Sequence, residues 1–77
     1  MPRGLRNWTF KDVVNFLKDH GFVYSYTHGS HHFYFRPDKP KLTPVCVAFH
    51  GRRAIKIWDM KSIVEQSGIP LKKWVEK

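Results

Sequence analysis

Residues 22–36 have the sequence FVYSYTHGSHHFYFR, in which two runs rich in aromatic residues flank a Gly-Ser pair. Aromatic and β-branched side chains favour strands, and glycine permits the tight turn that joins two antiparallel strands. This stretch predicts a β-hairpin with a strand from Phe22 to Thr27, a turn at His28-Gly29 and a second strand ending near Arg36. Side chains at positions 22, 24 and 26 (Phe22, Tyr24 and Tyr26) are expected on one face, because strand side chains alternate.

The segment before the hairpin predicts an amphipathic helix, because its apolar residues at positions 10, 13, 14 and 17 fall on one helical stripe. Thr9 is the expected N-cap, and Asp12 stands where it can complete a weaker form of the capping box. Trp8 and Val13 occupy the positions of a hydrophobic staple. Gly21 is the expected end of the helix.

The segments after the hairpin predict a turn over residues 37–40, a third strand from Leu42 to Phe49 and a second helix. Pro44 cannot donate a ladder hydrogen bond, so it indicates an edge strand or a bulge. Asp59 is the expected N-cap of the second helix, whose apolar stripe lies at positions 60, 63 and 64 and which Gly68 ends. A short final turn opened by the proline at position 70 is expected to bury Leu71, Trp74 and Val75.

This order of helix, three strands and helix predicts an α+β fold in one domain spanning residues 1–77. Consecutive strands joined by short turns pair antiparallel, so both helices can cover one face of a three-stranded sheet and leave the other face wet. Double-stranded-RNA-binding domains share this α-β-β-β-α element order. A half-covered basic sheet is a natural surface for nucleic acid.

The charge of the chain indicates an acidic partner. Fourteen Lys and Arg residues against six Asp and Glu give a net charge of +8, and the excess is densest between Arg36 and Lys61. Such a field attracts nucleic acid or an acidic protein, and the resulting binding weakens steeply with salt. Cys46 is the only cysteine, which excludes an intramolecular disulfide and favours a reducing compartment. With no apolar run of membrane-spanning or signal-peptide length, we expect a cytoplasmic protein without a membrane partner.

Histidine can take and give a proton near neutral pH because its unperturbed pKa is about 6.5. His31 and His32 begin the second strand and must point to opposite faces of the sheet. The alternation of side chains along a strand places His31 on the same face as Phe33 and His32 on the same face as Tyr34. From this alternation alone, His32 is expected to be the more solvent-facing of the two. Nevertheless, His31 lies at the start of the strand, where a side chain that points toward the covered face can still be exposed to water. The alternative is that both are ordinary half-buried strand histidines.

The other three histidines have simpler expected positions. His20 lies at a helix C-terminus, where its charge would oppose the helix dipole, so a capping role is expected. His28 is expected to be a solvated turn residue. His50 follows the third strand and can approach the turn at Gly29 only if the strand register allows it.

Three kinds of chemistry are open to these residues. Zinc could use His28, His31, His32, His50 and Cys46, but the paired short spacings typical of zinc sites are missing, so no metal or other cofactor is predicted. Ser30 beside His31 lacks a nearby orienting carboxylate, and Cys46 between valines is expected in the core. RNA phosphodiester cleavage needs only a proton-transferring imidazole and cations that stabilise charge. The candidate cations are Arg36, Arg52, Arg53 and Lys56.

The chain resembles the HicA group of toxin–antitoxin ribonucleases along nearly its whole length. The resemblance is carried by the first helix to Gly21-Phe22, Gly29-Ser30-His31, Arg36-Pro37-Asp38, Val47 to Gly51, and Ile63-Val64 to Gly68-Ile69. It implies a double-stranded-RNA-binding-like fold and cleavage of messenger RNA. The essential histidine of that family is the first after the Gly-Ser or Gly-Gly pair, which maps onto His31. The resemblance also implies a HicB-like antitoxin that covers the active site.

Two functions therefore remain as hypotheses. The first is a metal-independent endoribonuclease that cleaves mRNA, with His31 as general acid or base and with Ser30, His32 and His50 as candidate supporting residues. The second is a non-catalytic RNA-binding module of the same fold, in which the histidines only contact RNA. Replacing His31 with alanine discriminates between them, because only an enzyme would lose RNA cleavage while keeping RNA binding.

Overall fold

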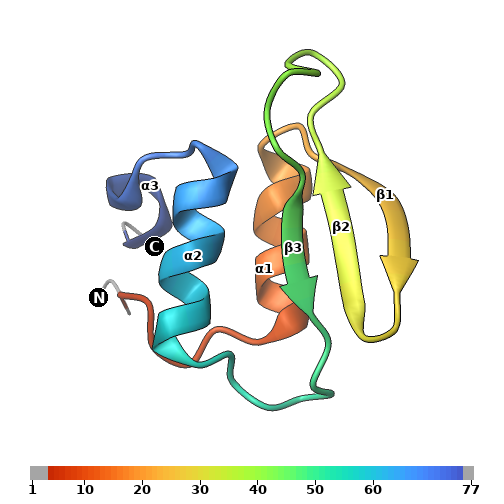
Figure 1. Ribbon diagram of the computed structural model, residues 1–77. Helices are drawn as coiled ribbons and strands as arrows, with labels where there is room; N and C mark the ends of the chain where they lie inside the picture. Colours follow the sequence, from red (N-terminus) through yellow and green to blue (C-terminus); the bar gives the residue numbers. More distant parts are fainter. Residues whose placement is uncertain (1–3, 76–77) are drawn as a thin grey trace.

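The computed structural model describes residues 4–75, and its elements follow the predicted order, with the short final turn expected after Pro70 forming a helix. These elements are α1 (Phe10–Asp19), β1 (Val23–His28), β2 (His31–Phe35), β3 (Val45–Ala48), α2 (Ile57–Ser67) and α3 (Leu71–Val75). The strands form one antiparallel sheet in the order β1-β2-β3. Figure 1 shows α1 behind this sheet and α2 alongside β3. The predicted α+β fold is confirmed.

Helix α1 begins and ends as its sequence predicts. The Thr9 hydroxyl accepts a hydrogen bond from the Asp12 amide at 3.2 Å, and the Asp12 carboxylate accepts one from the Thr9 amide at 3.0 Å, which completes a capping box. His20 is the C-cap, and its Nδ1 lies 2.8 Å from the carbonyl oxygen of Phe16. Gly21 follows with a φ of 88°, a left-handed conformation that favours glycine and turns the chain into β1.

A bulge in β1 overturns the expectation that Tyr24 and Tyr26 share a face. Tyr24 pairs with Tyr34, whereas Tyr26 pairs with Phe33, so two steps along β1 match one step along β2. The extra residue, Ser25, reverses the alternation of side chains beyond it. Tyr24 therefore lies on the helix side of the sheet, and Tyr26 lies on the other side.

The two faces of the sheet can be told apart by burial. On the inner face, toward α1, Tyr34, Val45 and Val47 are buried in the core, and His32 is half-buried. The outer face carries the alternate positions, where His31 pairs with Ala48 and Phe33 pairs with Cys46. The parity expectation that made His32 the more solvent-facing residue is wrong, because the buried aromatic ring of β2 is Tyr34 rather than Phe33. Burial also raises the pKa of the Tyr34 hydroxyl.

Strand β3 is an edge strand, as the proline before it indicated, but it is shorter than predicted. It covers Val45–Ala48 rather than residues 42–49, because the segment before it forms turns in which the Lys39 carbonyl accepts from the Leu42 amide at 3.0 Å. The Gln66 side chain on α2 accepts a hydrogen bond from the Cys46 amide at 3.2 Å. This hydrogen bond gives a partner to one backbone amide at the exposed edge of the sheet, and it links α2 to β3.

The second half of the chain differs from the prediction at two places. Helix α2 begins at Ile57, so Asp59 lies within its first turn instead of capping it, where a carboxylate is still favourable near unpaired amides. The predicted apolar stripe packs inward, and Gly68 ends the helix with a φ of 70°. In α3, Trp74 is buried as expected, but Leu71 is 52% exposed. The Trp74 ring fills the core by stacking on Phe16 with centroids 3.9 Å apart.

Candidate active site

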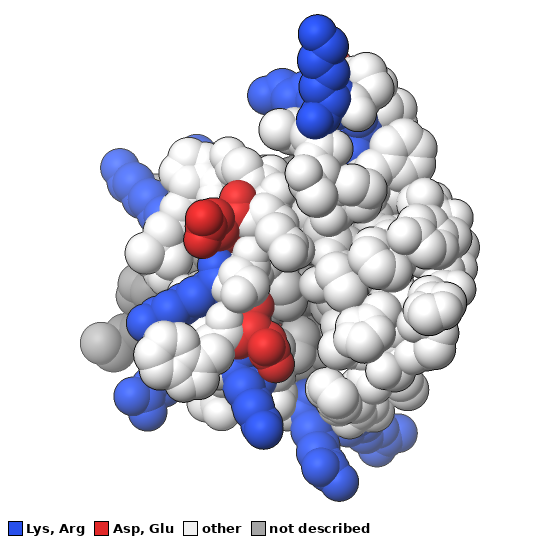
Figure 2. Space-filling view, viewed as in Figure 1, with Lys and Arg blue, Asp and Glu red and all other residues white. Residues whose placement is uncertain are grey.

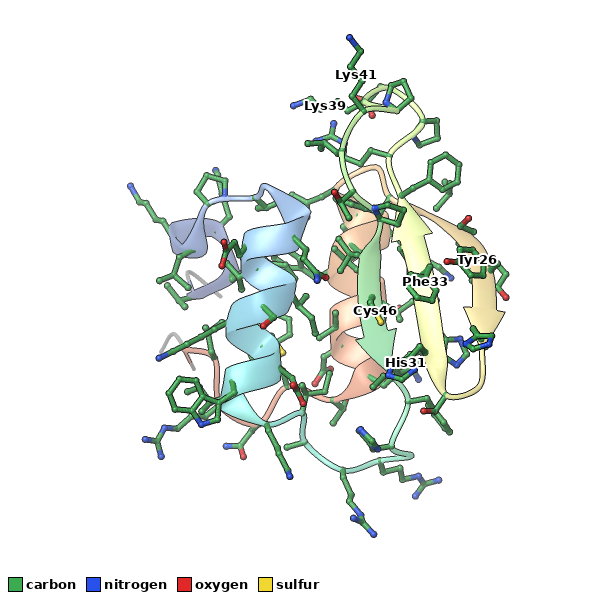
Figure 3. The ribbon with its side chains drawn as sticks, viewed as in Figure 1. Tyr26, His31, Phe33, Lys39, Lys41 and Cys46 are labelled. Carbon is green, nitrogen blue, oxygen red and sulfur yellow. The ribbon has the colours of Figure 1, made fainter. Side chains whose placement is uncertain are left out.

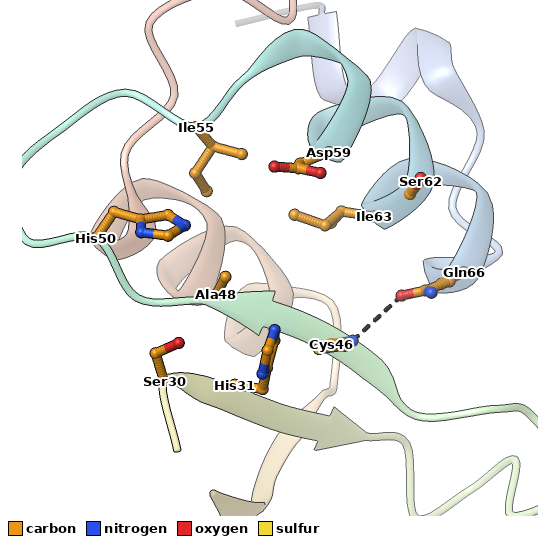
Figure 4. A pocket seen from close by; sticks show the side chains of 10 residues that line it. All are labelled: Ser30, His31, Cys46, Ala48, His50, Ile55, Asp59, Ser62, Ile63 and Gln66. Carbon is orange, nitrogen blue, oxygen red and sulfur yellow. Dashed lines mark hydrogen bonds between the residues drawn. The ribbon is translucent and has the colours of Figure 1, made fainter. Parts of the chain in front are cut away.

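A cleft of about 420 Å³ opens between the outer face of β2 and β3 and the first turns of α2. Its polar lining comes from three separate parts of the chain, as Figure 4 shows: Ser30, His31, His50, Asp59, Ser62 and Gln66. Its apolar wall is formed by Cys46, Ala48, Ile55 and Ile63. The cleft therefore places groups that can transfer protons beside an apolar wall.

His31 reaches this cleft because the hairpin turn is short. Gly29 has a φ of 62°, and the turn it shares with Ser30 closes directly onto the cross-strand pair of His28 and His31. The His31 side chain is exposed and points into the cleft (Figure 4). Within residues 4–75 neither of its ring nitrogens makes a hydrogen bond, so both are available to a bound substrate.

His32 has a different environment on the inner face. Its Nδ1 lies 3.2 Å from the Thr27 hydroxyl, which in turn lies 2.7 Å from the Tyr24 hydroxyl. The ring packs edge-on against Phe10 with centroids 4.8 Å apart. These contacts hold His32 on the inner face, apart from the cleft that His31 lines.

His50 comes close to the hairpin turn through a backbone contact next to it. The Phe49 amide donates a hydrogen bond to the Ser30 carbonyl at 2.8 Å, which ties the segment after β3 to the turn between β1 and β2. His50 is exposed and lines the cleft together with His31. The register thus allows the approach that the sequence left open.

The structure places two of the four candidate cations beside the cleft, a third in the same loop and one apart. A smaller hollow of about 210 Å³ adjoins the cleft and shares His50 and Asp59 with it, and Arg53 and Lys56 form its other polar lining. Arg52 is exposed in the same loop. Arg53 and Lys56 therefore place cationic side chains beside His50.

Arg36 lies beyond the opposite end of β2, roughly 16 Å from His31 at the usual rise of a strand. Its guanidinium forms two hydrogen bonds to Asp38, at 3.1 and 2.7 Å, and lies over the Phe22 ring. This pairing lowers the pKa of the Asp38 carboxyl, chiefly through the side-chain hydrogen bonds from Arg36. Arg36 is therefore not part of the histidine cleft.

Helix α2 supplies site residues that the sequence reading missed. Asp59, Ser62 and Gln66 lie at i, i+3 and i+7, so they form one polar stripe that borders the cleft. That spacing was visible in the sequence, but nothing local indicated that the stripe would face a histidine. Cys46 is half-buried at the cleft wall, and burial raises the pKa of its thiol.

Residues 4–75 also bear on metal binding and on membrane insertion. No group of three His, Cys, Asp or Glu side chains in that range gathers closely enough to hold a metal ion. None of the helices in that range has the length and apolar character needed to cross a bilayer.

These observations define a small α+β domain whose half-covered sheet carries a histidine cleft beside a basic loop. Residues 10–69 match the family model of the HicA toxin of bacterial toxin–antitoxin systems. The chain therefore belongs to the HicA toxin family. Comparisons with curated proteins and with solved structures gave no match.

Proposed function

We propose that this toxin is an endoribonuclease that cleaves messenger RNA without a metal ion, with His31 as its general acid or base. The observation that carries the proposal is the His31 ring, which opens into the cleft with both nitrogens unengaged by residues 4–75. An imidazole in this state can take a proton from a ribose hydroxyl near neutral pH.

The reaction proceeds by attack of the ribose 2′-oxygen on the adjacent phosphorus. His31 removes the 2′-hydroxyl proton, a new bond forms between the 2′-oxygen and phosphorus, and the bond from phosphorus to the 5′-oxygen breaks. The departing 5′-oxygen takes up a proton, for which His50 in the same cleft is the candidate donor. The products are a 2′,3′-cyclic phosphate and a free 5′-hydroxyl. A proton transfer of this kind contributes about 10²- to 10⁴-fold in rate.

Cations around the cleft stabilise the negative charge that develops on the phosphate. Arg53 and Lys56 line the adjoining hollow, and Arg52 lies exposed in the same loop. Cations held by the fold beside the place where charge develops stabilise that charge. The Ser30 hydroxyl at the cleft rim is a candidate to hydrogen-bond the same phosphate.

An antitoxin would inhibit the toxin by covering this cleft. The family belongs to bacterial toxin–antitoxin systems, and the toxin carries a net charge of +8. An acidic HicB-like protein would be attracted by the same field that attracts RNA, so one surface can serve both partners. A messenger RNA substrate implies that the toxin acts in the cytoplasm.

The proposal is tested with purified wild-type protein and the His31→Ala variant on an end-labelled RNA. We expect cleavage by the variant to fall by about 100-fold or more, while its RNA affinity and thermal unfolding stay close to those of the wild type. Substrate with a single 2′-deoxy sugar at the cut site should resist cleavage, and the product should carry a cyclic phosphate. Cleavage should persist in EDTA.

Other outcomes identify other mechanisms. A His31→Ala variant that cleaves as fast as the wild type contradicts the catalytic assignment. Loss of activity in EDTA, or cleavage of the 2′-deoxy substrate, would instead indicate attack by a metal-activated water. RNA binding without any cleavage by the wild type would indicate a non-catalytic RNA-binding module.

A further inference from the structure

The outer face of the sheet carries an aromatic pair that the reaction does not use. Tyr26 and Phe33 pair across β1 and β2, and their rings stack with centroids 4.5 Å apart and planes 9° from parallel. Tyr26 is 51% exposed on strand β1. The bulge at Ser25 is what turns this ring outward, so a local irregularity of β1 creates the pair.

The surroundings of this pair are uncharged, and the cations lie at the two ends of the face. Figure 2 shows the sheet face free of Lys, Arg, Asp and Glu, with blue side chains above and below it. Figure 3 places Lys39 and Lys41 beyond one end of the strands and His31 at the other end, with Tyr26 and Phe33 between them. The basic loop with Arg52 and Arg53 follows on the His31 side.

We propose that this outer face, formed by Tyr26 and Phe33, is a stacking platform for the bases of single-stranded RNA; the proposal rests on the function proposed above. Bases in a single strand can stack on exposed aromatic rings, whereas bases in a duplex are already stacked and hidden. The charge pattern fits this occupant, because cations at both ends can hold the phosphate backbone while bases contact the uncharged middle.

The platform also fixes the path of the RNA relative to the histidine. Phe33 and His31 lie two residues apart on the same face of β2, about 7 Å along the strand. A nucleotide stacked on Phe33 would therefore hold a neighbouring phosphate over the cleft. The platform binds and positions substrate, and takes no part in proton transfer.

The test measures binding separately from cleavage by working in the His31→Ala protein, with a fluorescent single-stranded oligonucleotide. Replacing Tyr26 with leucine, or Phe33 with leucine, should weaken binding by about 5- to 150-fold, the range measured for loss of one base–aromatic stack. Tyr26→Trp should restore it. The same sequence in a duplex should bind more weakly than the single strand.

Tyr24 provides a matched control on the same strand. It is a tyrosine with the same exposed fraction, 51%, but it lies on the inner side of the sheet. Tyr24→Leu should leave RNA affinity unchanged. Thermal unfolding of each variant shows whether a loss of binding comes from a loss of folding.

A second measurement needs no substitution on the platform. Cys46 pairs with Phe33 across β2 and β3 on the outer face, so bound single-stranded RNA should slow alkylation of its thiol. Equal effects of Tyr24→Leu and Tyr26→Leu, equal affinity for duplex and single strand, or unprotected Cys46 at saturating RNA would each overturn the platform.

The same experiments separate the platform from its alternatives and from the proposed function. Platform variants that keep RNA affinity but lose binding to an antitoxin would assign this face to a protein partner and overturn the proposal. A concentration-dependent dimer lost in Tyr26→Leu would assign it to a second copy of the chain.

If wild-type protein cleaves RNA while platform variants bind normally, only the platform fails. If wild-type protein binds through the platform but cuts nothing, only the nuclease fails.

Discussion

The inner and outer faces of the sheet are built from alternate residues of the same short strands, yet they differ in almost every physical property. Val45 and Val47 on the inner face are fully buried against the helices, whereas their neighbours Cys46 and Ala48 line an open cleft. In β2, the buried Tyr34 stands next to Phe33, which stacks with an exposed tyrosine. Alternate residues of the same strand therefore contribute to the stability of the core and to the candidate site.

This alternation explains how two adjacent histidines come to differ. His32 is held by Thr27 and Phe10 on the inner face, whereas His31 is left open to the cleft. Because the side-chain period of a strand is two residues, a slip of one residue in β2 would exchange the two rings. The glycine turn at Gly29 and the pairing with β3 fix the register, and so they also select the proposed catalytic residue.

The largest expected difference between the faces comes from placing a carboxylate on each in β3. Val47→Asp should abolish folding, because an unpaired buried charge costs several kcal/mol, a large part of the stability of a small domain. Ala48→Asp, one residue further, should fold and should weaken RNA binding through repulsion of phosphate. Circular dichroism and urea unfolding measure the first effect, and fluorescence binding measures the second.

Two results would contradict this contrast. A folded Val47→Asp protein with normal stability would show that the inner face is not sealed. An unfolded Ala48→Asp protein would show that the outer face beside α2 is part of the core rather than a binding surface. Ala48→Ser serves as a control, since it adds a small polar group without charge.

A smaller difference between the faces is expected in the free energy of unfolding when each of the two histidines is replaced with alanine. His32→Ala removes the contact to the Thr27 hydroxyl and the edge-on packing on Phe10, which together contribute about 1–2 kcal/mol. His31→Ala removes an exposed ring and should change the free energy of unfolding by less than about 0.5 kcal/mol. Urea unfolding of both variants provides the comparison.

RNA cleavage should show the opposite order. The His32→Ala protein should retain most of its activity at temperatures where it is folded, while the His31→Ala protein should not. Equal losses of activity in the two folded variants would mean that His32 also acts in catalysis, despite its position on the inner face.

Features that depend on local sequence could be predicted from the chain. The capping box of Thr9 and Asp12, the apolar stripe of α1 and the left-handed ends at Gly21 and Gly68 each involve residues within one or two turns of each other. Helix α2 was also predicted, although its first turn begins before Asp59. Such boundaries are the least certain part of a helix because its ends are short of hydrogen bonds.

Features that depend on pairing between distant segments could not be predicted. The bulge at Ser25 exists only relative to β2, and it decides that Tyr24 and Tyr26 lie on opposite faces. Burial of Tyr34 in place of Phe33 likewise follows from the tertiary packing of the core, because both rings are aromatic and similar in size. The alternation of side chains along β2 was therefore predicted correctly, but the face predicted to be exposed to solvent was the wrong one.

The candidate site combines both kinds of information. The family resemblance selected His31, and the structure shows its ring in the cleft, but the role of that ring stays a prediction. The meeting of His50 with the hairpin turn and the contribution of Asp59 required the tertiary fold. Arg36 was grouped with the other cations by composition, yet an extended strand separates it from them.

The smallest expected effect concerns Cys46, which lies where the outer face meets the cleft wall. Burial raises the pKa of its thiol, so at any pH near neutrality less of it is thiolate than in a free cysteine. Alkylation by iodoacetamide should be a few-fold slower than for a cysteine-containing peptide, and its rate should rise with pH to a midpoint above that of the peptide. In urea this difference in alkylation rate between the protein and the peptide should disappear.

A midpoint below that of the peptide would mean that nearby positive charge stabilises the thiolate more than burial opposes it. The cleft wall would then be an electropositive surface, and the outer face would differ from the inner face by its charge as well as by its exposure.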